Sequence, residues 1–189
     1  MEPAATSSAT VRSRPLAARR SWSGACLRIT GFALMTAVAA QVRVPVPGTD
    51  VPMTLQLLAV LVAGLVLPVG ESVSCMALYL VCGAAGLPVF APGSGGLLGA
   101  TGGYLAGFVL AVALVGFLRG PNGAAWRMML AAMAGAATVV ALGAIWRALA
   151  SGDWTWAAAT GALPFAPKAL IEALLAVAIV RRTGRLPAW

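Results

Sequence analysis

Long apolar runs occupy most of the 189-residue sequence, and nearly all of its charged residues stand between those runs. Hydrophobic residues make up 60% of the chain and charged residues 10%, whereas a typical soluble domain is about 25% charged. A membrane-spanning helix needs roughly 20 mostly apolar residues. The pattern therefore predicts an all-α integral membrane protein.

The runs and their breaks predict six transmembrane helices. We expect helices at 24–40, 53–67, 72–85, 102–118, 127–147 and 164–180. A tight turn is expected at 68–71 and another at 119–123, because proline and glycine gather there. Residues 151–160 carry two tryptophans and are expected to form an interfacial connector. Residues 23–189 then form one six-helix transmembrane domain, preceded by a disordered basic cytoplasmic tail at 1–22.

Two polar loops interrupt the apolar pattern, at 44–56 and at 86–104. The first contains three prolines, which remove backbone donors and break helices. We therefore expect it to be neither helix nor paired strand but a stiff, extended segment. With six spans both loops fall on the same side of the membrane, where two ordered loops over a helical bundle indicate a lid above a small-molecule pocket.

The basic residues predict the orientation. Six spans place both termini on one side, and that side carries ten of the thirteen lysines and arginines. The other side carries only Arg43, Arg147 and Lys168. Because cytoplasmic segments are enriched in basic residues, both termini are expected in the cytoplasm and both loops outside, in a bacterial cytoplasmic (inner) membrane.

Two other interpretations of the basic residues are weaker. The net charge of +8 does not indicate nucleic-acid binding, because the basic residues flank apolar runs and form no face interleaved with aromatic residues. The basic start followed by Ala37-Val38-Ala39 resembles a cleavable signal peptide. Cleavage would leave five spans, so the uncleaved helix is the preferred interpretation.

The sequence carries little that could perform catalysis. It has no histidine, no Walker-type phosphate loop and no GxSxG motif. Cys26, Cys75 and Cys82 form no CxxC pair and stand in or beside apolar runs, where buried packing is their expected role. We therefore expect no enzyme activity, no metal site and no cofactor.

Polar residues at the expected outer ends of the helices are the candidate ligand-binding residues. Backbone donors at a helix start are unpaired, and glycines there let a ligand approach the chain closely. The candidates at the starts of the second and fourth runs are Thr54, Gln56, Thr101, Gly102, Gly103 and Tyr104. Helix packing is the alternative role for the two glycines, and membrane-interface anchoring is the alternative for the tyrosine.

Ionisable residues inside or beside the spans form a second set of candidates. Lys168 and Glu172 stand one helical turn apart in the last run, where charges are costly and usually functional. They can also simply neutralise each other. Arg43 and Asp50 in the first loop are either ligand contacts or surface charges. Ala33 and Ala37 in the first run form a small-residue face, suited either to internal packing or to docking a partner.

Several motifs occur in one order and resemble the BioY family, the biotin-specific substrate-capture subunits of energy-coupling-factor (ECF) transporters. They are Pro45-Val46-Pro47, Val51-Pro52-Met53-Thr54-Leu55-Gln56, Leu78-Tyr79-Leu80 with Gly83, Gly86-Leu87-Pro88-Val89-Phe90, and Thr101-Gly102-Gly103-Tyr104 with Gly107-Phe108. The resemblance implies a six-helix membrane protein that captures biotin from outside. It also implies a transmembrane coupling subunit as partner, docked on Ala33 and Ala37, and two ABC-type ATPase subunits that use the ATP.

Biotin has a ureido ring with two donors and one acceptor, an apolar sulfur ring and a carboxylated tail. If the resemblance holds, polar partners for the ureido ring are expected among Thr54, Gln56 and Thr101. Phe90 and Tyr104 are candidate pocket walls. Lys168 or Arg43 is the candidate partner of the carboxylate.

The sequence departs from the family pattern in three places. The family usually has a proline at the position of Ala100 and a glycine near Pro68, and the third departure is in the last run. There the family has an acid followed three residues later by a lysine, whereas this chain has Lys168 before Glu172. Either the same ligand meets a rearranged pocket, or the ligand is another vitamin or a precursor such as desthiobiotin. A structural subunit that binds no ligand is the alternative from a different class.

Overall fold

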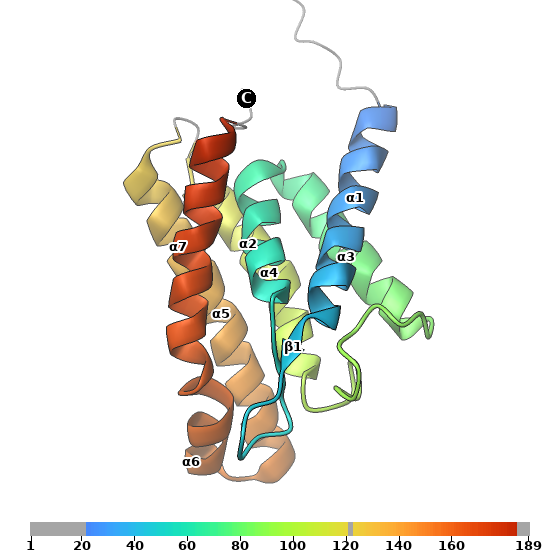
Figure 1. Ribbon diagram of the computed structural model, residues 1–189, viewed down its shortest axis with the longest axis vertical. Coiled ribbons are helices and arrows are strands. Elements are labelled where there is room, and N and C mark those ends of the chain that lie inside the picture. Colours follow the sequence, from blue (N-terminus) through green and yellow to red (C-terminus); the bar gives the residue numbers. More distant parts are fainter. Residues whose placement is uncertain (1–21, 121–122, 185–189) are drawn as a thin grey trace, which may run out of the picture.

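The computed structural model describes residues 22–120 and 123–184. It is a bundle of helices with one small hairpin (Figure 1). The predicted 1–22 tail lies outside the described residues except for Trp22, which begins the first helix, α1 (Trp22–Gln41). The start of α1 and the end of the last helix lie at the same end of the bundle in Figure 1, and the hairpin lies toward the other end.

The hairpin follows α1 directly. Strands β1 (Arg43–Val44) and β2 (Met53–Thr54) pair antiparallel, with Arg43 opposite Thr54 and Val44 opposite Met53. The prediction of an unpaired segment was therefore wrong at its two ends. The prolines lie in the loop between the strands, where no ladder hydrogen bond needs their missing N–H.

Two shorter helices follow, α2 (Gln56–Val66) and α3 (Val69–Ala84). The predicted helix at 53–67 is shortened because Met53 and Thr54 belong to β2. The predicted turn at 68–71 was too long, because Pro68 directly precedes the first turn of α3, where a missing N–H costs nothing. The carbonyls of Leu65 and Leu67 accept hydrogen bonds from the buried guanidinium of Arg119, which satisfies the end of α2.

After the loop at 85–101, α4 (Gly102–Leu118) packs along α5 (Ala125–Ser151). Small residues allow this close approach: a Cβ on Gly135 would lie 2.5 Å from Val115 Cγ2. The chain then reverses at Gly152, which has a φ of 72° that favours glycine. It continues through α6 (Trp154–Ala157), the short π-helix η1 (Ala158–Ala162) and α7 (Phe165–Thr183). The predicted connector at 151–160 is thus largely helical.

The surface of the bundle is apolar. Large side chains such as Leu34, Phe117, Leu130 and Ile171 are exposed on α1, α4, α5 and α7. Within the described residues three helical stretches are long and apolar enough to cross a membrane: Trp22–Gln41, Ala125–Ser151 and Trp154–Thr183. α2, α3 and α4 are apolar but shorter. At 1.5 Å per residue α2 is about 16 Å long, so length by itself does not make it a span.

Candidate functional site

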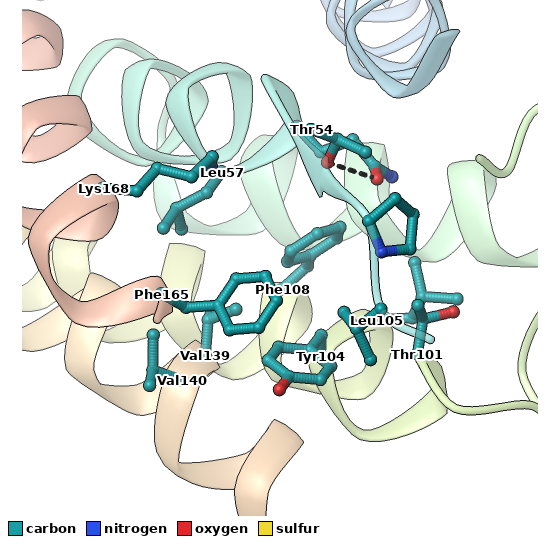
Figure 2. Close-up of a pocket in the computed structure, with 13 residues that line it drawn as sticks. Thr54, Leu57, Thr101, Tyr104, Leu105, Phe108, Val139, Val140, Phe165 and Lys168 are labelled. Carbon is teal, nitrogen blue, oxygen red and sulfur yellow. Dashed lines mark hydrogen bonds between the residues drawn. The ribbon is translucent and has the colours of Figure 1, made fainter. Parts of the chain in front are cut away.

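A pocket lies beside the hairpin, between the starts of α2, α4 and α7 and the middle of α5 (Figure 2). Its empty volume is about 520 Å³, part of it open to solvent. The lining combines a few polar side chains with apolar and aromatic ones. The lining residues are Val51, Pro52, Thr54, Gln56, Leu57, Thr101, Tyr104, Leu105, Phe108, Val139, Val140, Phe165 and Lys168.

A chain of hydrogen bonds fixes the polar wall next to the hairpin. Thr54 Oγ1 donates to Gln56 Oε1 over 2.9 Å, and Gln56 Nε2 donates to the Tyr79 hydroxyl over 2.6 Å. The tyrosine in turn donates to the Val89 carbonyl over 3.0 Å. β2 leads straight into α2, which places Thr54 and Gln56 side by side. The wall still offers lone pairs on Thr54 Oγ1 and a second N–H on Gln56 to a ligand.

Aromatic rings form the opposite wall. Tyr104 and Phe108 lie one turn apart on α4, and Phe165 opens α7. The rings of Tyr104 and Phe165 have centroids 5.7 Å apart. The Tyr104 hydroxyl donates to the Gly161 carbonyl over 2.5 Å, and Gly143 makes room for the ring, since a Cβ there would lie 2.1 Å from Tyr104 Cε1. The ring is therefore held in one orientation.

One ion pair lies at the pocket itself. Lys168 lines the pocket, and its ammonium lies 2.5 Å from Glu172 Oε2. The lysine side chain is 22% exposed and the glutamate only 3%. The second oxygen, Glu172 Oε1, is buried and makes no standard hydrogen bond to any described residue. The pair presents a cation toward the pocket, with its counter-charge buried behind it.

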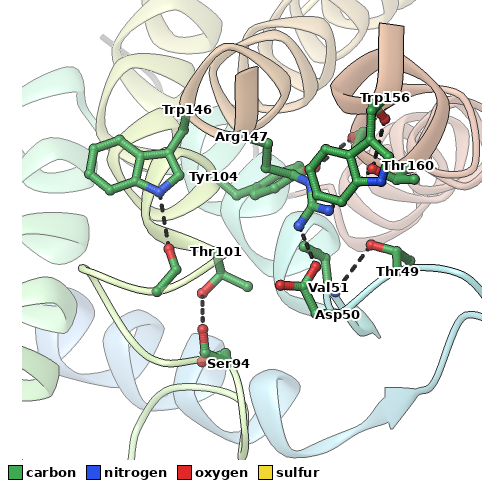
Figure 3. Close-up of polar contacts among 12 residues, drawn as sticks. Thr49, Asp50, Val51, Ser94, Thr101, Tyr104, Trp146, Arg147, Trp156 and Thr160 are labelled. Carbon is green, nitrogen blue, oxygen red and sulfur yellow. Dashed lines mark hydrogen bonds and ion pairs between the residues drawn. The ribbon is translucent and has the colours of Figure 1, made fainter. Parts of the chain in front are cut away.

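A second ion pair joins the hairpin to α5 (Figure 3). Arg147 Nη1 lies 2.5 Å from Asp50 Oδ1, and Nη2 donates to Thr160 Oγ1 over 3.1 Å. The guanidinium carbon also lies 4.4 Å from the centre of the Trp156 ring. Sequence reasoning treated these residues as surface charges and an interfacial tryptophan. The 97-residue separation of the pair gave no local signal.

The start of α6 holds Trp156 in place over that guanidinium. Asp153 Oδ1 accepts hydrogen bonds from Thr155 Oγ1 over 2.6 Å and from the backbone N–H groups of Thr155 and Trp156, each over 2.9 Å. The Thr155 hydroxyl, together with these N–H groups, lowers the pKa of Asp153 below its usual value. A charged Asp153 is therefore the form that caps α6.

Of the ten predicted ligand-binding residues, five line the pocket: Thr54, Gln56, Thr101, Tyr104 and Lys168. Glu172 lies behind the lysine. Thr101 Oγ1 also donates to the carbonyls of Ser94 and Gly96, each over 3.4 Å, which ties the pocket rim to the 85–101 loop. Of the wall residues, Tyr104 was among the sequence candidates, whereas Phe108, Phe165 and Val139 were not.

The remaining four residues lie outside the pocket lining. Phe90 packs edge-on against Tyr79 and fills the space above Gly83. Arg43 Nη1 donates to the Pro92 carbonyl over 2.7 Å, so it holds the 85–101 loop to the hairpin.

The two glycines of α4 serve close packing. A Cβ on Gly102 would lie 2.1 Å from the Leu97 carbonyl oxygen, and one on Gly103 would lie 2.3 Å from Trp146 Cβ. Gly103 therefore packs against α5, and Gly102 packs mainly against the loop at 85–101. A ligand-binding role for these two glycines stays a prediction.

The predicted docking residues Ala33 and Ala37 are buried on α1. They line an apolar groove between α1 and α3 with an empty volume of about 440 Å³. Among the described side chains no three of the histidine, cysteine or acidic type gather as metal ligands. Partner docking and the absence of a metal both stay predictions.

Comparisons with known proteins agree with the geometry. A family model described as the BioY family matches residues 10–188. A probable biotin transporter BioY from Pyrococcus horikoshii is 36% identical over 154 residues, which are 80% of this chain and 90% of the relative. The biotin transporter BioY from Thermotoga maritima is 33% identical over 158 residues, 82% and 92% of the two chains.

One solved structure has the same fold. The S-component for biotin from an ECF-type ABC transporter superposes with a TM-score of 0.78. The match covers 87% of this chain and 93% of the solved one, at 24% identity. At this identity the match shows that the helical architecture is shared.

Proposed function

The chain belongs to the BioY family, and on this premise we propose that it captures biotin from outside the cell as the substrate-specific subunit of an ECF-type transporter. The observation that carries the proposal is the pocket beside the hairpin. Its lining combines the hydroxyl and amide groups next to the hairpin, the ammonium group of Lys168 on α7 and three aromatic rings. The chain is a transporter component and not an enzyme.

The lining complements the bicyclic head of biotin. The lone pairs of Thr54 Oγ1 suit a ureido N–H, and the Lys168 ammonium suits the ureido oxygen. Glu172, buried behind Lys168, holds that ammonium in place. Tyr104, Phe108 and Phe165 provide the apolar surface for the sulfur ring. The hydrogen bond from the Lys168 ammonium would be charge-assisted and therefore stronger than one from a neutral donor.

We further propose that six spans cross the bacterial cytoplasmic membrane with both termini inside. The shorter helices α2, α3 and α4 complete the set, since helices of such length fit where the bilayer thins or neighbouring loops enter it. The excess of basic residues on the side of the termini supports this orientation. The hairpin and the 85–101 loop then form the outer lid, because Val51, Pro52 and Thr101 line the pocket from that side.

We propose that partner subunits supply the energy for uptake, since the sequence has no phosphate-binding loop with which this chain could itself use ATP. A transmembrane coupling subunit and two ABC-type ATPase subunits would supply the energy. The α1–α3 groove that contains Ala33 and Ala37 is the proposed docking surface for the coupling subunit. Its apolar lining and small residues suit a membrane helix.

Thermal unfolding of the purified protein in detergent tests the proposal. Biotin at a hundredfold excess over its dissociation constant is expected to stabilise the protein by about 2.7 kcal/mol. Stabilisation by desthiobiotin or another vitamin but not by biotin would assign a different ligand. No stabilisation by any of them would favour a structural subunit and contradict the proposal.

A further inference from the structure

A second hollow lies next to the pocket and is open to the side of the bundle. Its empty volume is about 680 Å³, including open solvent, and Asp50, Ala100 and Arg147 line it. Asp50 is followed in the chain by Val51, and Ala100 by Thr101, and both of these following residues line the pocket. The hairpin loop and the residues just before α4 thus separate the pocket from this second hollow, the side cleft.

Arg147 has an unusual position at this wall. Its side chain is only 3% exposed, yet its charged partner Asp50, on the loop of the hairpin, is 64% exposed. The Nε of Arg147 is buried and makes no hydrogen bond to any residue that the structure describes. A buried donor without an acceptor is costly. This guanidinium therefore retains capacity for a further acceptor.

The buried arginine Arg119 provides the contrast. Its guanidinium donates to the backbone carbonyls of Leu65 and Leu67, which are fixed by the end of α2. Arg147 instead lines a cavity, and its anionic partner is an exposed side chain that can rotate into solvent. Arg119 therefore has the contacts of a structural residue, whereas the anion on Arg147 can be exchanged.

We propose that Arg147 binds the carboxylate of the ligand, which takes the place of Asp50 on the guanidinium. This inference rests on the proposed function. Lys168, the cation that lines the pocket, already has a buried carboxylate as its partner. Figure 2 shows Lys168 and Thr101 on opposite sides of the pocket, so a ring held near Lys168 can direct its tail past Thr101 toward the side cleft. A planar guanidinium matches a carboxylate with two parallel hydrogen bonds.

Biotin and its uncharged carboxamide distinguish the carboxylate from the ring. For Arg147→Gln we expect biotin to bind about ten- to a hundredfold more weakly, with less than about a threefold change for the amide. Arg147→Lys keeps the positive charge but lacks the planar guanidinium, so its affinity for biotin should lie between those of the unmodified chain and of Arg147→Gln. Titration calorimetry on the purified chain in detergent measures all of these affinities.

The Asp50→Asn substitution should change the affinity for biotin in the opposite direction, and this test does not require an Arg147 variant to fold. Because it removes the competing carboxylate, biotin should bind up to about tenfold more tightly while the amide is unaffected. Arg127→Gln is the matched control, since Arg127 is exposed near the other end of the same helix and stacks on Trp126. It should change neither affinity.

Equal losses of biotin and amide in Arg147→Gln would overturn the inference and make the ion pair a purely structural link. Weaker binding of both ligands to Asp50→Asn would do the same. If the unmodified chain binds neither ligand, the proposed function itself fails and this inference falls with it. That outcome is separate, because it appears before any substitution is made.

Discussion

The two ion pairs at the site are built in opposite ways. In one, a buried acid, Glu172, holds a partly exposed base, Lys168, that faces the pocket. In the other, a buried base, Arg147, holds an exposed acid, Asp50, on the hairpin. The first pair lies within α7 and borders the pocket, whereas the second joins the hairpin loop to α5 and borders the side cleft. They differ in which charge the protein encloses.

The difference matters because the two buried groups respond differently when a partner leaves. A carboxyl group that loses its cation can take up a proton and become neutral. A guanidinium stays charged at any physiological pH and must find another anion. The Lys168–Glu172 pair is thus suited to hold a neutral polar group. The Arg147–Asp50 pair is suited to exchange one carboxylate for another.

Removing Lys168, the partly exposed base of the first pair, is expected to have the largest effect. Lys168→Met leaves Glu172 buried without its cation, which should lower the free energy of unfolding by about 3–5 kcal/mol. Binding of biotin and of its amide should fall together, because the lysine is assigned to the ureido ring. Chemical unfolding and calorimetry in detergent measure the two effects.

The double variant Lys168→Met with Glu172→Leu is the control for this experiment, because it removes both charges. It should recover stability without recovering binding. A larger loss for biotin than for the amide in Lys168→Met would assign the carboxylate to Lys168 and contradict the role given to Arg147.

Displacing the ring of Tyr104, which lies between the two ion pairs, should have a smaller effect. Gly143→Ala would place a Cβ about 2.1 Å from the Tyr104 ring, which lines the pocket and lies next to Arg147. The ring must shift, at an expected cost of about 1–3 kcal/mol in stability. Affinity for biotin and for its amide should decrease together in the same titrations.

Gly31→Ala on α1, where a Cβ meets no atom within 4 Å, is the control. Unchanged binding by Gly143→Ala would show that Tyr104 is not a wall of the site.

The smallest effect is expected at Asp153, which acts on the second pair only through Trp156. The pKa of Asp153 is lower in the folded protein than its ordinary value of 3.8, which we take for the unfolded chain. The charged side chain therefore contributes its full stabilisation at a pH above that ordinary value. That contribution is lost as the pH falls through the folded pKa. The melting temperature of the protein should therefore exceed that of Asp153→Asn at pH 6, and the difference should shrink toward pH 3. A difference that does not depend on pH would show that the charge of Asp153 does not cap α6.

Some of the site was predictable because local chemistry encoded it. Prolines and a glycine between two apolar runs marked the loop at 44–56 as a break between helices, although not its strand pairing. Polar residues at helix starts marked Thr54, Gln56, Thr101 and Tyr104. A lysine within an apolar run marked Lys168. Each signal depends only on a few neighbouring residues and on the cost of placing polar groups in an apolar environment.

The sequence alone determined the helical, membrane-type architecture and the polar half of the pocket, because apolar run length and helix-breaking residues act locally. Only the tertiary structure decided which apolar residues face the cavity, since α4 and α5 are apolar on all sides and no periodicity separates Phe108 or Val139 from side chains that face outward. It likewise decided the pairing of Asp50 with Arg147 across 97 positions, because that contact exists only once α5 has folded back against the hairpin.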